Sequence, residues 1–350
     1  MKFLVVGLGG IGQRHVRNIR ALLGSSAEIM AYRVRRESPT LTDNLAVEAG
    51  VDLEERYALR VFDQLDGALA ERPDAVLICN PTSLHVPVAL EAARAGTGIF
   101  VEKPLSHRLD GTEELITLAE SKGLVGLVGY QLRFHPCLQR LQALLDANAI
   151  GRVVGVRIEI GEYLPGWHPY EDYRQMYASR AGLGGGVVLS QIHELDYVYW
   201  LFGMPRRVFA VGGHLSRLEI DVEDTASLLL ECVVDGRPIP VHVHQDFVQR
   251  PPTRACEVIG DAGKIEVDLR ANSITAYDEG GHVSEAAVFA SFERNQLFID
   301  EMSHFLGCLA GRETPVVTLR DGRRSLEIAL AAKRSMDTGH VVDLEAGGVR

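Results

Sequence analysis

The sequence predicts an α/β protein in which a parallel sheet covered by helices precedes a mixed or antiparallel sheet. The first third of the chain alternates short apolar runs with longer amphipathic stretches, as in a parallel sheet buried on both faces. After about residue 130 the strands become longer and alternate between apolar and polar residues, which indicates a sheet with an open face. The length of 350 residues is too great for one ordinary core and fits two domains.

Five compact apolar runs in the first part predict strands, at residues 3–6, 28–32, 75–79, 98–101 and 124–128. Segments between them have helical character, at residues 12–23, 86–95 and 111–122. Because each strand is followed by a helical stretch, the pattern favours parallel pairing with helices on both faces.

The second part predicts longer strands, at residues 153–160, 207–212, 225–233, 239–247, 258–263 and 264–268. The last two flank a glycine-containing turn. Helices are expected at residues 186–202, 295–310 and 326–336. The sequence contains no internal repeat and no low-complexity segment.

Composition narrows the class of protein. A formal net charge of −11 argues against general nucleic-acid binding, which needs a basic face. The five cysteines are scattered and never form a Cys-x-x-Cys pair, so we expect neither disulfides nor a metal site. The N-terminal apolar run is too short for a signal peptide or a membrane span. We therefore expect a reduced, cytoplasmic protein.

A glycine-rich turn follows the first predicted strand and opens a helix. Its residues match the G-x-G-x-x-G pattern: Gly7, Gly9, Gly10, Ile11 and Gly12. The first glycine permits the tight turn, the second lets the backbone approach a pyrophosphate, and the third lets helix and strand pack closely. A structural turn is the alternative, but the strand–turn–helix context favours dinucleotide binding.

The second predicted strand bears on the choice of dinucleotide. An acid about 20 residues after the glycines would bind the ribose hydroxyls of NAD, but no acid stands at the end of this strand. Arg33, Arg35 and Arg36 stand there instead, and an arginine can hold a 2′-phosphate. The alternative is a solvated basic loop. We favour NADP over NAD.

Several motifs in order resemble those of one family. The glycine turn, the segment Asn80–His85 and the tripeptide Glu102-Lys103-Pro104 resemble successive motifs of the glucose–fructose oxidoreductase / inositol dehydrogenase / MocA (Gfo/Idh/MocA) family. The segment 129–136 is similar to its hinge, and Gly184–Gly186 with His193–Asp196 is similar to its active-site helix. With Gly260–Gly263 and the final helix, the resemblance covers almost the whole chain.

This resemblance implies an N-terminal Rossmann domain, a doubly wound parallel sheet at residues 1–128. It also implies a C-terminal α/β domain with a large open, mostly antiparallel sheet at 129–350. Further implications are NAD(P), a sugar or cyclitol substrate, and a homodimer or homotetramer that pairs the open sheets. Besides the glycine turn and Arg33, the residues it implies at the cofactor are Asn80, Pro81, His85, Glu102 and Lys103. The stretch 161–174 looks like a subgroup associated with bacterial surface-sugar biosynthesis.

Two residues are candidates for catalysis, Lys103 and His193. Lys103 follows a strand of the parallel sheet and so lies at a carboxyl-end crevice, where such sheets bind ligands. The alternative is a surface lysine paired with Glu102. His193 can exchange a proton near neutral pH, and Asp196 could orient its ring. A core histidine, or a structural pairing of Asp196, is the alternative. The family match favours catalysis at both residues.

One departure from the family pattern affects the proton path. Many members carry an aspartate four residues before this histidine, whereas this chain has Leu189 there and Ser190 beside it. Leucine cannot relay a proton. Substrate contacts are expected from Lys103, His193, Arg133, His135, Trp167, His168 and Tyr170. For the last five of these, packing or surface exposure is the alternative.

The leading hypothesis is an NAD(P)-dependent oxidoreductase that transfers hydride between nicotinamide and a secondary alcohol or ketone of a sugar, sugar derivative or cyclitol. One alternative is an NAD-dependent glycosidase, since the family includes such members. Another is a catalytically silent cofactor-binding regulator, which the absence of the aspartate motivates. The retained Lys103 and His193 argue against the silent regulator.

Overall fold

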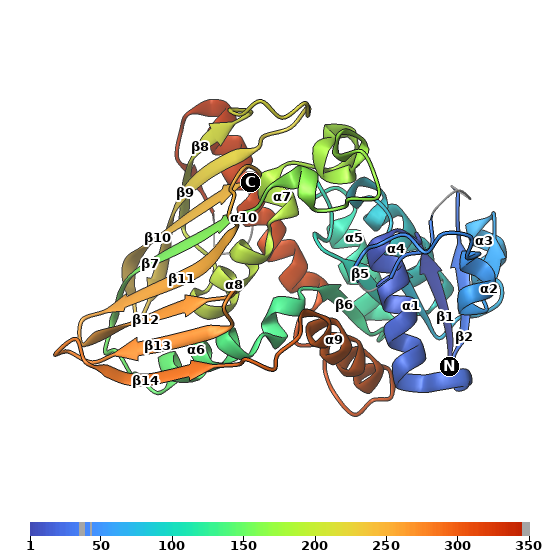
Figure 1. The fold of residues 1–350 in the computed structure, drawn as a ribbon, viewed down its shortest axis with the longest axis horizontal. Helices are drawn as coiled ribbons and strands as arrows, with labels where there is room; N and C mark the ends of the chain where they lie inside the picture. The colour runs from blue at the N-terminus through green and yellow to red at the C-terminus, as the bar shows by residue number, and fades with distance from the viewer. Residues whose placement is uncertain (35–38, 43, 345–350) are drawn as a thin grey trace.

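The computed structural model describes residues 1–34, 39–42 and 44–344, which form two sheets side by side (Figure 1). In this part of the chain the first sheet has six parallel strands in the order β3-β2-β1-β4-β5-β6. Its strands are β1 (Lys2–Val6), β2 (Glu28–Tyr32), β3 (Arg60–Phe62), β4 (Ala75–Ile78), β5 (Gly98–Glu102) and β6 (Gly126–Gly129). The strand order reverses between β1 and β4, which creates the crevice where such sheets bind nucleotides. The predicted Rossmann arrangement is confirmed.

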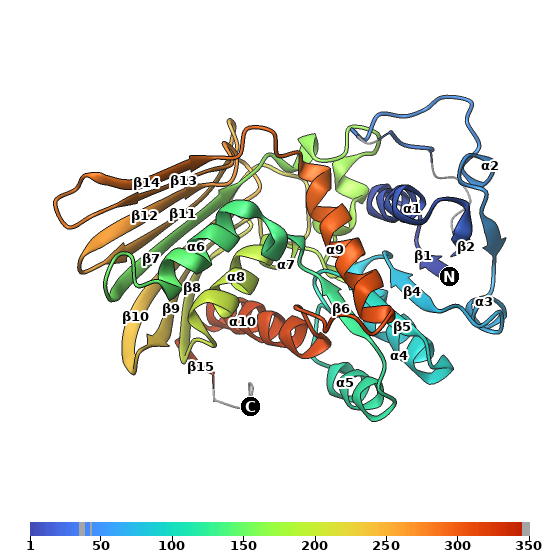
Figure 2. The same ribbon diagram turned by 90° about the horizontal axis from the view of Figure 1, so that it is seen from below.

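Helices cover both faces of the first sheet. The N-terminal part supplies α1 (Gly10–Leu23), α2 (Leu53–Tyr57), α3 (Leu65–Leu69), α4 (His85–Ala95) and α5 (Thr112–Ser121). One helix comes from much later in the chain: α9 (Arg294–Leu309) lies beside α1 (Figure 2). Phe305 of α9 packs edge-on against Phe100 of β5 with ring centroids 5.5 Å apart. Burying such aromatic surface fixes α9 to the first sheet.

The second sheet comprises nine described strands in the order β14-β13-β12-β11-β7-β10-β9-β8-β15. Only β7 and β10 pair in parallel, and the other neighbours are antiparallel. The strands are β7 (Val153–Gly161), β8 (Arg207–Gly213), β9 (Thr225–Val234), β10 (Arg237–Asp246), β11 (Thr253–Gly260), β12 (Gly263–Asp268), β13 (Ser273–Tyr277), β14 (Val283–Val288) and β15 (Val342–Asp343). The predicted, mostly antiparallel sheet is confirmed.

One face of the second sheet is covered by α6 (Pro136–Asp146), α8 (His193–Phe202) and α10 (Leu319–Thr338), as Figure 2 shows. The other face carries exposed apolar side chains, among them Val154, Phe209, Val211 and Leu229. The sheet therefore has one buried and one open face, which explains its alternating sequence.

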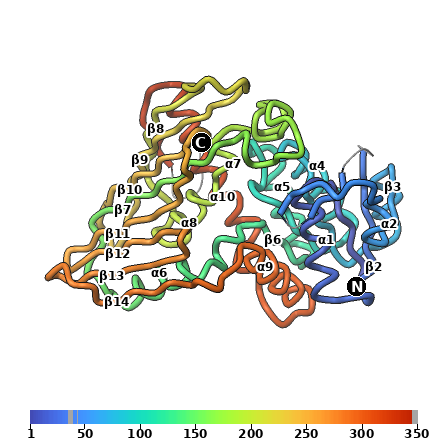
Figure 3. Tube along the Cα trace, in the orientation of Figure 1, coloured from blue at the N-terminus to red at the C-terminus, as the bar shows by residue number. Residues whose placement is uncertain are grey.

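The chain path joins the two sheets twice. After β14 the chain runs to α9 on the first sheet, and α10 then leads it back to β15 on the second (Figure 3). The predicted domain boundary between residues 128 and 129 falls within β6, the last strand of the first sheet. This boundary stays a prediction. The helix α9, which follows the boundary in the chain, packs on the first sheet.

Some element boundaries differ from the prediction. The single helix expected at 186–202 is two helices, α7 (Val187–Ser190) and α8, because Gln191 is held between them. Its side-chain amide donates to the Asp246 carbonyl at 2.9 Å, and its own carbonyl accepts from Gln245 at 2.6 Å. The last helix begins earlier than expected because Thr318 and Asp321 form a capping box.

Candidate active site at the junction of the two sheets

The glycine turn lies at the carboxyl end of β1, where each glycine is needed for a different reason. Gly7 has φ +94°, and a Cβ there would come within 2.9 Å of the backbone of Cys79 and Asn80. A Cβ on Gly12 would come within 2.0 Å of the Gly7 carbonyl oxygen, so only glycine lets α1 pack here. Around Gly9, by contrast, no described atom lies within 4 Å of the Cβ position. This open side fits the approach of a pyrophosphate to the backbone.

Arg33 follows β2, where the sequence predicts the adenosine end of the cofactor site. Its side chain is buried, and its guanidinium Nη1 lies 3.1 Å from the Glu54 carboxylate of α2. The Glu54 carboxylate would therefore compete with a 2′-phosphate for Nη1 of this guanidinium. Arg35 and Arg36, the other arginines of the predicted basic cluster, lie outside the described residues.

The segment Asn80–His85 follows β4 and lies against the turn that follows β5. The buried ring of His85 lies between two carbonyl oxygens, with Nδ1 2.8 Å from Pro104 and Nε2 2.9 Å from Asn80. Burial lowers the pKa of His85, although both carbonyl contacts oppose this. His85 thus holds the Asn80-Pro81 turn against the Glu102-Lys103-Pro104 turn.

Lys103 reaches from the first sheet to the second domain. It is half-buried, and its Nζ donates a hydrogen bond of 2.8 Å to the carbonyl oxygen of Ser190, the last residue of α7. Beneath it, the buried Glu102 carboxylate lies 2.6 Å from Nε2 of His15 on α1. The two predicted motifs, about 90 residues apart in the chain, therefore meet in space.

His193 begins α8, only three residues after the carbonyl that Lys103 contacts. Its ring is 5% exposed and lies edge-on to Tyr130 at 5.7 Å, and its Nδ1 has no hydrogen-bond partner in the described structure. Burial lowers the pKa of His193 well below its usual value, and the positive charges of Lys103, Arg254 and Arg294 add to this. The neutral imidazole is therefore the favoured form, with an Nδ1 that is unpartnered in the described ranges.

Asp196 does not orient the His193 ring. Its carboxylate instead accepts two hydrogen bonds from Arg133, at 2.9 and 2.8 Å, and a third from Ser325 at 3.0 Å. Arg133 also donates to the Val316 carbonyl oxygen at 3.1 Å and is 8% exposed. This buried pair joins the hinge segment to α8 and α10, and its placement gives no support to the predicted substrate contact of Arg133.

His135 likewise has a local partner. Its Nδ1 accepts the backbone N–H of Cys137 at 3.2 Å, which caps α6, and its ring packs on Phe292. Burial lowers the pKa of His135 to about 4, with a further contribution from Arg254. Its placement favours the packing alternative over a substrate contact.

The segment after β7 holds the remaining predicted residues and brings one of them, Tyr170, to the glycine turn. Trp167 lies edge-on to Phe247 at 5.2 Å, and its buried indole N–H has no partner within the described ranges. His168 lies 2.6 Å from Glu171 and stacks on Tyr170. The Tyr170 hydroxyl lies 3.1 Å from the Cβ position of Gly10 in the turn, and burial raises the pKa of Tyr170 to about 12. A segment of the second domain thus closes over the predicted pyrophosphate site.

Comparison with protein families decides what this arrangement belongs to. Residues 1–130 match the GFO_IDH_MocA model, described as an oxidoreductase family with an NAD-binding Rossmann fold, and residues 138–266 match the GFO/IDH/MocA C-terminal domain. The chain belongs to the GFO/IDH/MocA oxidoreductase family. The resemblance stated from its motifs is confirmed, and the chain is an NAD(P)-dependent oxidoreductase.

Relatives of this family member span its full length. It is similar to a myo-inositol 2-dehydrogenase of Thermotoga maritima, with 28% identity over 99% of each chain. It is also similar to a scyllo-inositol 2-dehydrogenase (NAD(+)) of Bacillus subtilis, with 26% identity over 97% of this chain and 95% of the relative. Among solved structures, the WlbA dehydrogenase of Bordetella pertussis in complex with NADH and UDP-GlcNAcA has a TM-score of 0.79, with 23% identity over 99% of each chain. At that identity the match supports the fold.

In this oxidoreductase, Leu189 and Ser190 lie on different sides of α7. Leu189 lines a pocket of about 520 Å³ together with Gly184, Gly185 and Lys333, whereas the Ser190 carbonyl oxygen meets Lys103. The Ser190 hydroxyl is buried and unpartnered within the residues described. The polar side chain of α7 nearest to Lys103 therefore carries a hydroxyl and not a carboxylate.

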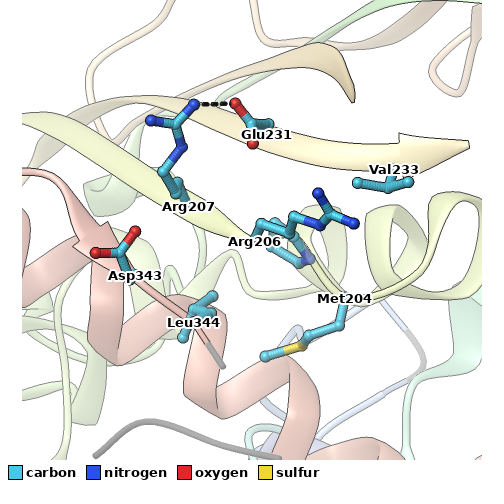
Figure 4. Close-up of a pocket in the computed structure, with 8 residues that line it drawn as sticks. Met204, Arg206, Arg207, Glu231, Val233, Asp343 and Leu344 are labelled. Carbon is cyan, nitrogen blue, oxygen red and sulfur yellow. Dashed lines mark hydrogen bonds and ion pairs between the residues drawn. The ribbon is translucent and has the colours of Figure 1, made fainter. Parts of the chain in front are cut away.

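A second pocket, of about 570 Å³, lies at the outer edge of the second sheet (Figure 4). Arg207 and Glu231 form an ion pair on its rim, and Met204, Val233 and Leu344 supply apolar walls. Its lining contains none of the predicted site residues, so we do not assign catalysis to it.

Sequence reasoning missed His15 and Tyr130. His15 is buried against Glu102 and Phe100, and Tyr130 packs on His193. No local pattern marks either residue, because their burial depends on α9 and α8, which follow much later in the sequence.

Within the described ranges, no helix is long and apolar enough to span a bilayer, and no group of side chains could hold a metal ion.

Proposed function

We propose that this chain transfers hydride between the nicotinamide of NAD(P) and a secondary alcohol or ketone of a sugar, sugar derivative or cyclitol. The observation that carries the proposal is the meeting of Lys103 with the α7–α8 segment, through the 2.8 Å hydrogen bond to Ser190, three residues before His193. The names of the relatives, inositol and sugar dehydrogenases, support this substrate class. A place in surface-sugar biosynthesis is part of the same proposal.

The glycine turn fits a dinucleotide, because its one open side is at Gly9 and the α1 N-terminus offers backbone N–H groups there. Gly7, Gly10, Ile11 and Gly12 would complete this cradle. Along the rest of the crevice, the cofactor would lie against Asn80, Pro81, His85, Glu102 and Lys103. When bound, a nicotinamide supplies the hydride acceptor or donor.

The protein's own groups would handle the proton and the charge on the reacting oxygen. Lys103 donates a hydrogen bond to that oxygen and stabilises the negative charge that develops on it. His193, a neutral imidazole with an Nδ1 unpartnered among the described residues, accepts the hydroxyl proton during oxidation. Trp167, His168 and Tyr170 border the substrate side. Arg133 and His135 would shape this site through packing.

A preference for NADP over NAD is the second part of the proposal. It rests on the absence of an acid at the end of β2 and on the arginines that follow. Glu54 competes for Arg33, so we expect Glu54→Gln to strengthen NADP binding by removing a negative charge that would repel the 2′-phosphate. Titration of NAD(H) and NADP(H) against the wild type, Glu54→Gln and Arg33→Ala tests this. Tighter NAD(H) binding by the wild type, or an Arg33→Ala variant that binds NADP(H) normally, would reject it.

We also propose that copies of the chain pair through the open face of the second sheet, as a homodimer or homotetramer. Val211 is 62% exposed there and Leu229 51% exposed, beside Phe209, and an apolar patch of this kind marks an interaction surface. The five cysteines are free and buried, which supports a reducing, cytoplasmic location.

The proposed reaction is tested by incubating the purified protein with NAD(P)⁺ and a panel of sugars, glycosides and cyclitols. Reduced nicotinamide that accumulates with a ketone product supports the dehydrogenase. Release of an aglycone without net reduction would favour the glycosidase. Cofactor binding with neither product would favour the silent regulator.

A further inference from the structure

His15 of α1 is a polar side chain in the apolar layer between α1, β5 and α9. Its ring is fully buried and follows Gly12, the last glycine of the dinucleotide turn, by less than one turn of the helix. The ring packs edge-on against Phe100 of β5 at 4.9 Å and against Phe298 of α9 at 6.3 Å. A polar group in such surroundings destabilises the fold unless a hydrogen bond compensates for its lost hydration.

The hydrogen bond that the His15 ring makes goes to the turn that carries Lys103. Its Nε2 lies 2.6 Å from Oε1 of Glu102, whereas its Nδ1 has no partner among the described residues. The other carboxyl oxygen of Glu102, Oε2, accepts the backbone N–H of Lys103 at 3.3 Å. One carboxyl group therefore joins α1 to the backbone of the lysine that reaches α7.

The first sheet leaves room for this carboxyl group. Gly129 of β6 pairs with Glu102 of β5, and a Cβ at Gly129 would come within 3.3 Å of Oε2 and 3.4 Å of Oε1. Contacts this close would press the carboxyl group out of its place, because protein interiors have little spare volume. Glu102 is itself buried, so water competes little for its contact with His15.

The helix that carries His15 is held from its other side by α9. Arg14 donates a hydrogen bond of 2.7 Å to Asn295, and the Asn295 amide donates to Asn18 at 3.1 Å. The Arg14 guanidinium also lies over the Phe298 ring, 4.8 Å from its centroid. These contacts hold α1 on both sides of His15 in the chain, so its ring is a firm support for Glu102.

The side chain of Lys103 depends on how its backbone is placed. It is half-buried, and its Nζ donates the hydrogen bond of 2.8 Å to the Ser190 carbonyl oxygen across the junction of the two sheets. A lysine has a flexible four-carbon stem, so a fixed backbone limits where its ammonium group can lie. Misplacing a reacting group by about 1 Å can lower a rate by as much as roughly 10²-fold.

We propose that His15 is a positioning residue: through the Glu102 carboxyl group it fixes the Lys103 turn relative to α1, the helix whose N-terminus faces the dinucleotide. The lysine is thereby placed by the same helix that places the cofactor. The contact orients Glu102 whichever of the two groups carries the shared hydrogen. The consequence for turnover rests on the proposed dehydrogenase function, whereas the placement of Lys103 does not.

The test is competitive acetylation of the full-length protein with a trace of acetic anhydride, followed lysine by lysine with mass spectrometry. The chain has five lysines, so the four besides Lys103 are internal references: Lys2, Lys122, Lys264 and Lys333. The variants are His15→Gln and His15→Asn. The glutamine amide takes the place of Nε2 and can reach Glu102, whereas the asparagine amide takes the place of Nδ1 and cannot. The two variants are matched, since both bury a neutral amide.

We expect His15→Asn to raise the labelling of Lys103 relative to the references by about threefold or more, because a lysine on a loosened turn leaves its hydrogen bond more often. His15→Gln should label as the wild type does. Unchanged Lys103 labelling in both variants overturns the proposal, and so does an equal rise in both, which would make ring packing the cause. If His15→Asn does not fold, Glu102→Asp shortens the same contact from its other side, and the absence of a rise there overturns the proposal.

Turnover gives the second measurement, with a substrate found in the sugar panel. His15→Asn should lower kcat by about tenfold or more with little change in the KM for cofactor, and His15→Gln should retain most of the wild-type kcat. A raised cofactor KM with a normal kcat would place His15 in cofactor binding and overturns the proposal. If no substrate is turned over, the dehydrogenase function fails, while the labelling still decides whether His15 places Lys103.

Discussion

The two halves of the candidate site are built in different ways. The dinucleotide half is a continuous turn, Gly7–Gly12, in which Gly7 and Gly12 leave no room for a Cβ beside neighbouring backbone atoms, whereas Gly9 faces open space. The substrate half is assembled from Lys103, the segment after β7, α7 and α8, which come from separate parts of the chain. The residues of the first half follow one another in a short motif, so its spacing in the sequence identifies it. The residues of the second half come together only when both sheets have packed.

The largest expected effect is the loss of cofactor binding in Gly9→Asp. No described atom lies within 4 Å of the Cβ position, so the variant should fold, but its carboxylate would repel the pyrophosphate. Calorimetry should detect no binding of either dinucleotide, while thermal unfolding stays close to that of the wild type. Gly12→Ala is the contrasting variant, because its Cβ would come within 2.0 Å of the Gly7 carbonyl oxygen and should lower stability itself. Normal binding by Gly9→Asp would contradict this account of the turn.

Asp196→Ala should lower stability more than it alters chemistry. It leaves the buried Arg133 guanidinium without its carboxylate, and breaking a buried pair on one side costs about 3–5 kcal/mol. Denaturant unfolding measures this loss of free energy. Arg320→Ala, which breaks an exposed pair with Glu120, should cost no more than about 1 kcal/mol. A stable Asp196→Ala protein with a raised KM would instead place Arg133 at the substrate.

Lys103→Ala and His193→Ala should each lower turnover by roughly 10²-fold or more and leave cofactor affinity nearly intact. If the two groups act on one oxygen, the double variant should cost much less than the product of the single effects. The depressed pKa of His193 also predicts that oxidation stays active below pH 6.5, since the base remains neutral there. Single variants with wild-type turnover would remove these residues from the mechanism.

The smallest effect is expected where the segment after β7 meets the glycine turn. In the structure the Tyr170 hydroxyl lies 3.1 Å from the Cβ position of Gly10, on the side from which a pyrophosphate would approach the backbone. Tyr170→Phe removes this competitor, so cofactor should bind a few-fold more tightly, in line with about 1 kcal/mol for one hydrogen bond. Tyr173→Phe, in the same segment but bonded to the Glu219 backbone, is the control. Weaker cofactor binding by Tyr170→Phe would show that the hydroxyl supports the site.

The sequence was a good guide wherever the signal is local. Apolar runs located both sheets, and strand–turn–helix context located the dinucleotide turn. It was a poor guide where a distant partner decides. The sequence alone does not reveal a partner for Arg133. In the structure Asp196, 63 residues later, accepts its hydrogen bonds. The helix expected at 186–202 breaks at Gln191 because the end of β10 holds that residue on both its amide and its carbonyl.

The position of α9 has a consequence for how the protein is made. The ribosome completes all the strands of the first sheet by residue 129, yet the helix that covers Phe100 begins at Arg294. During synthesis at roughly 5–20 residues per second, that face of the sheet stays without its cover while the strands β7 to β14 of the second sheet emerge. A nascent chain stopped before α9 would hold every glycine of the dinucleotide turn on an incomplete core. The first sheet therefore receives its last covering helix only after most of the second sheet has been synthesised.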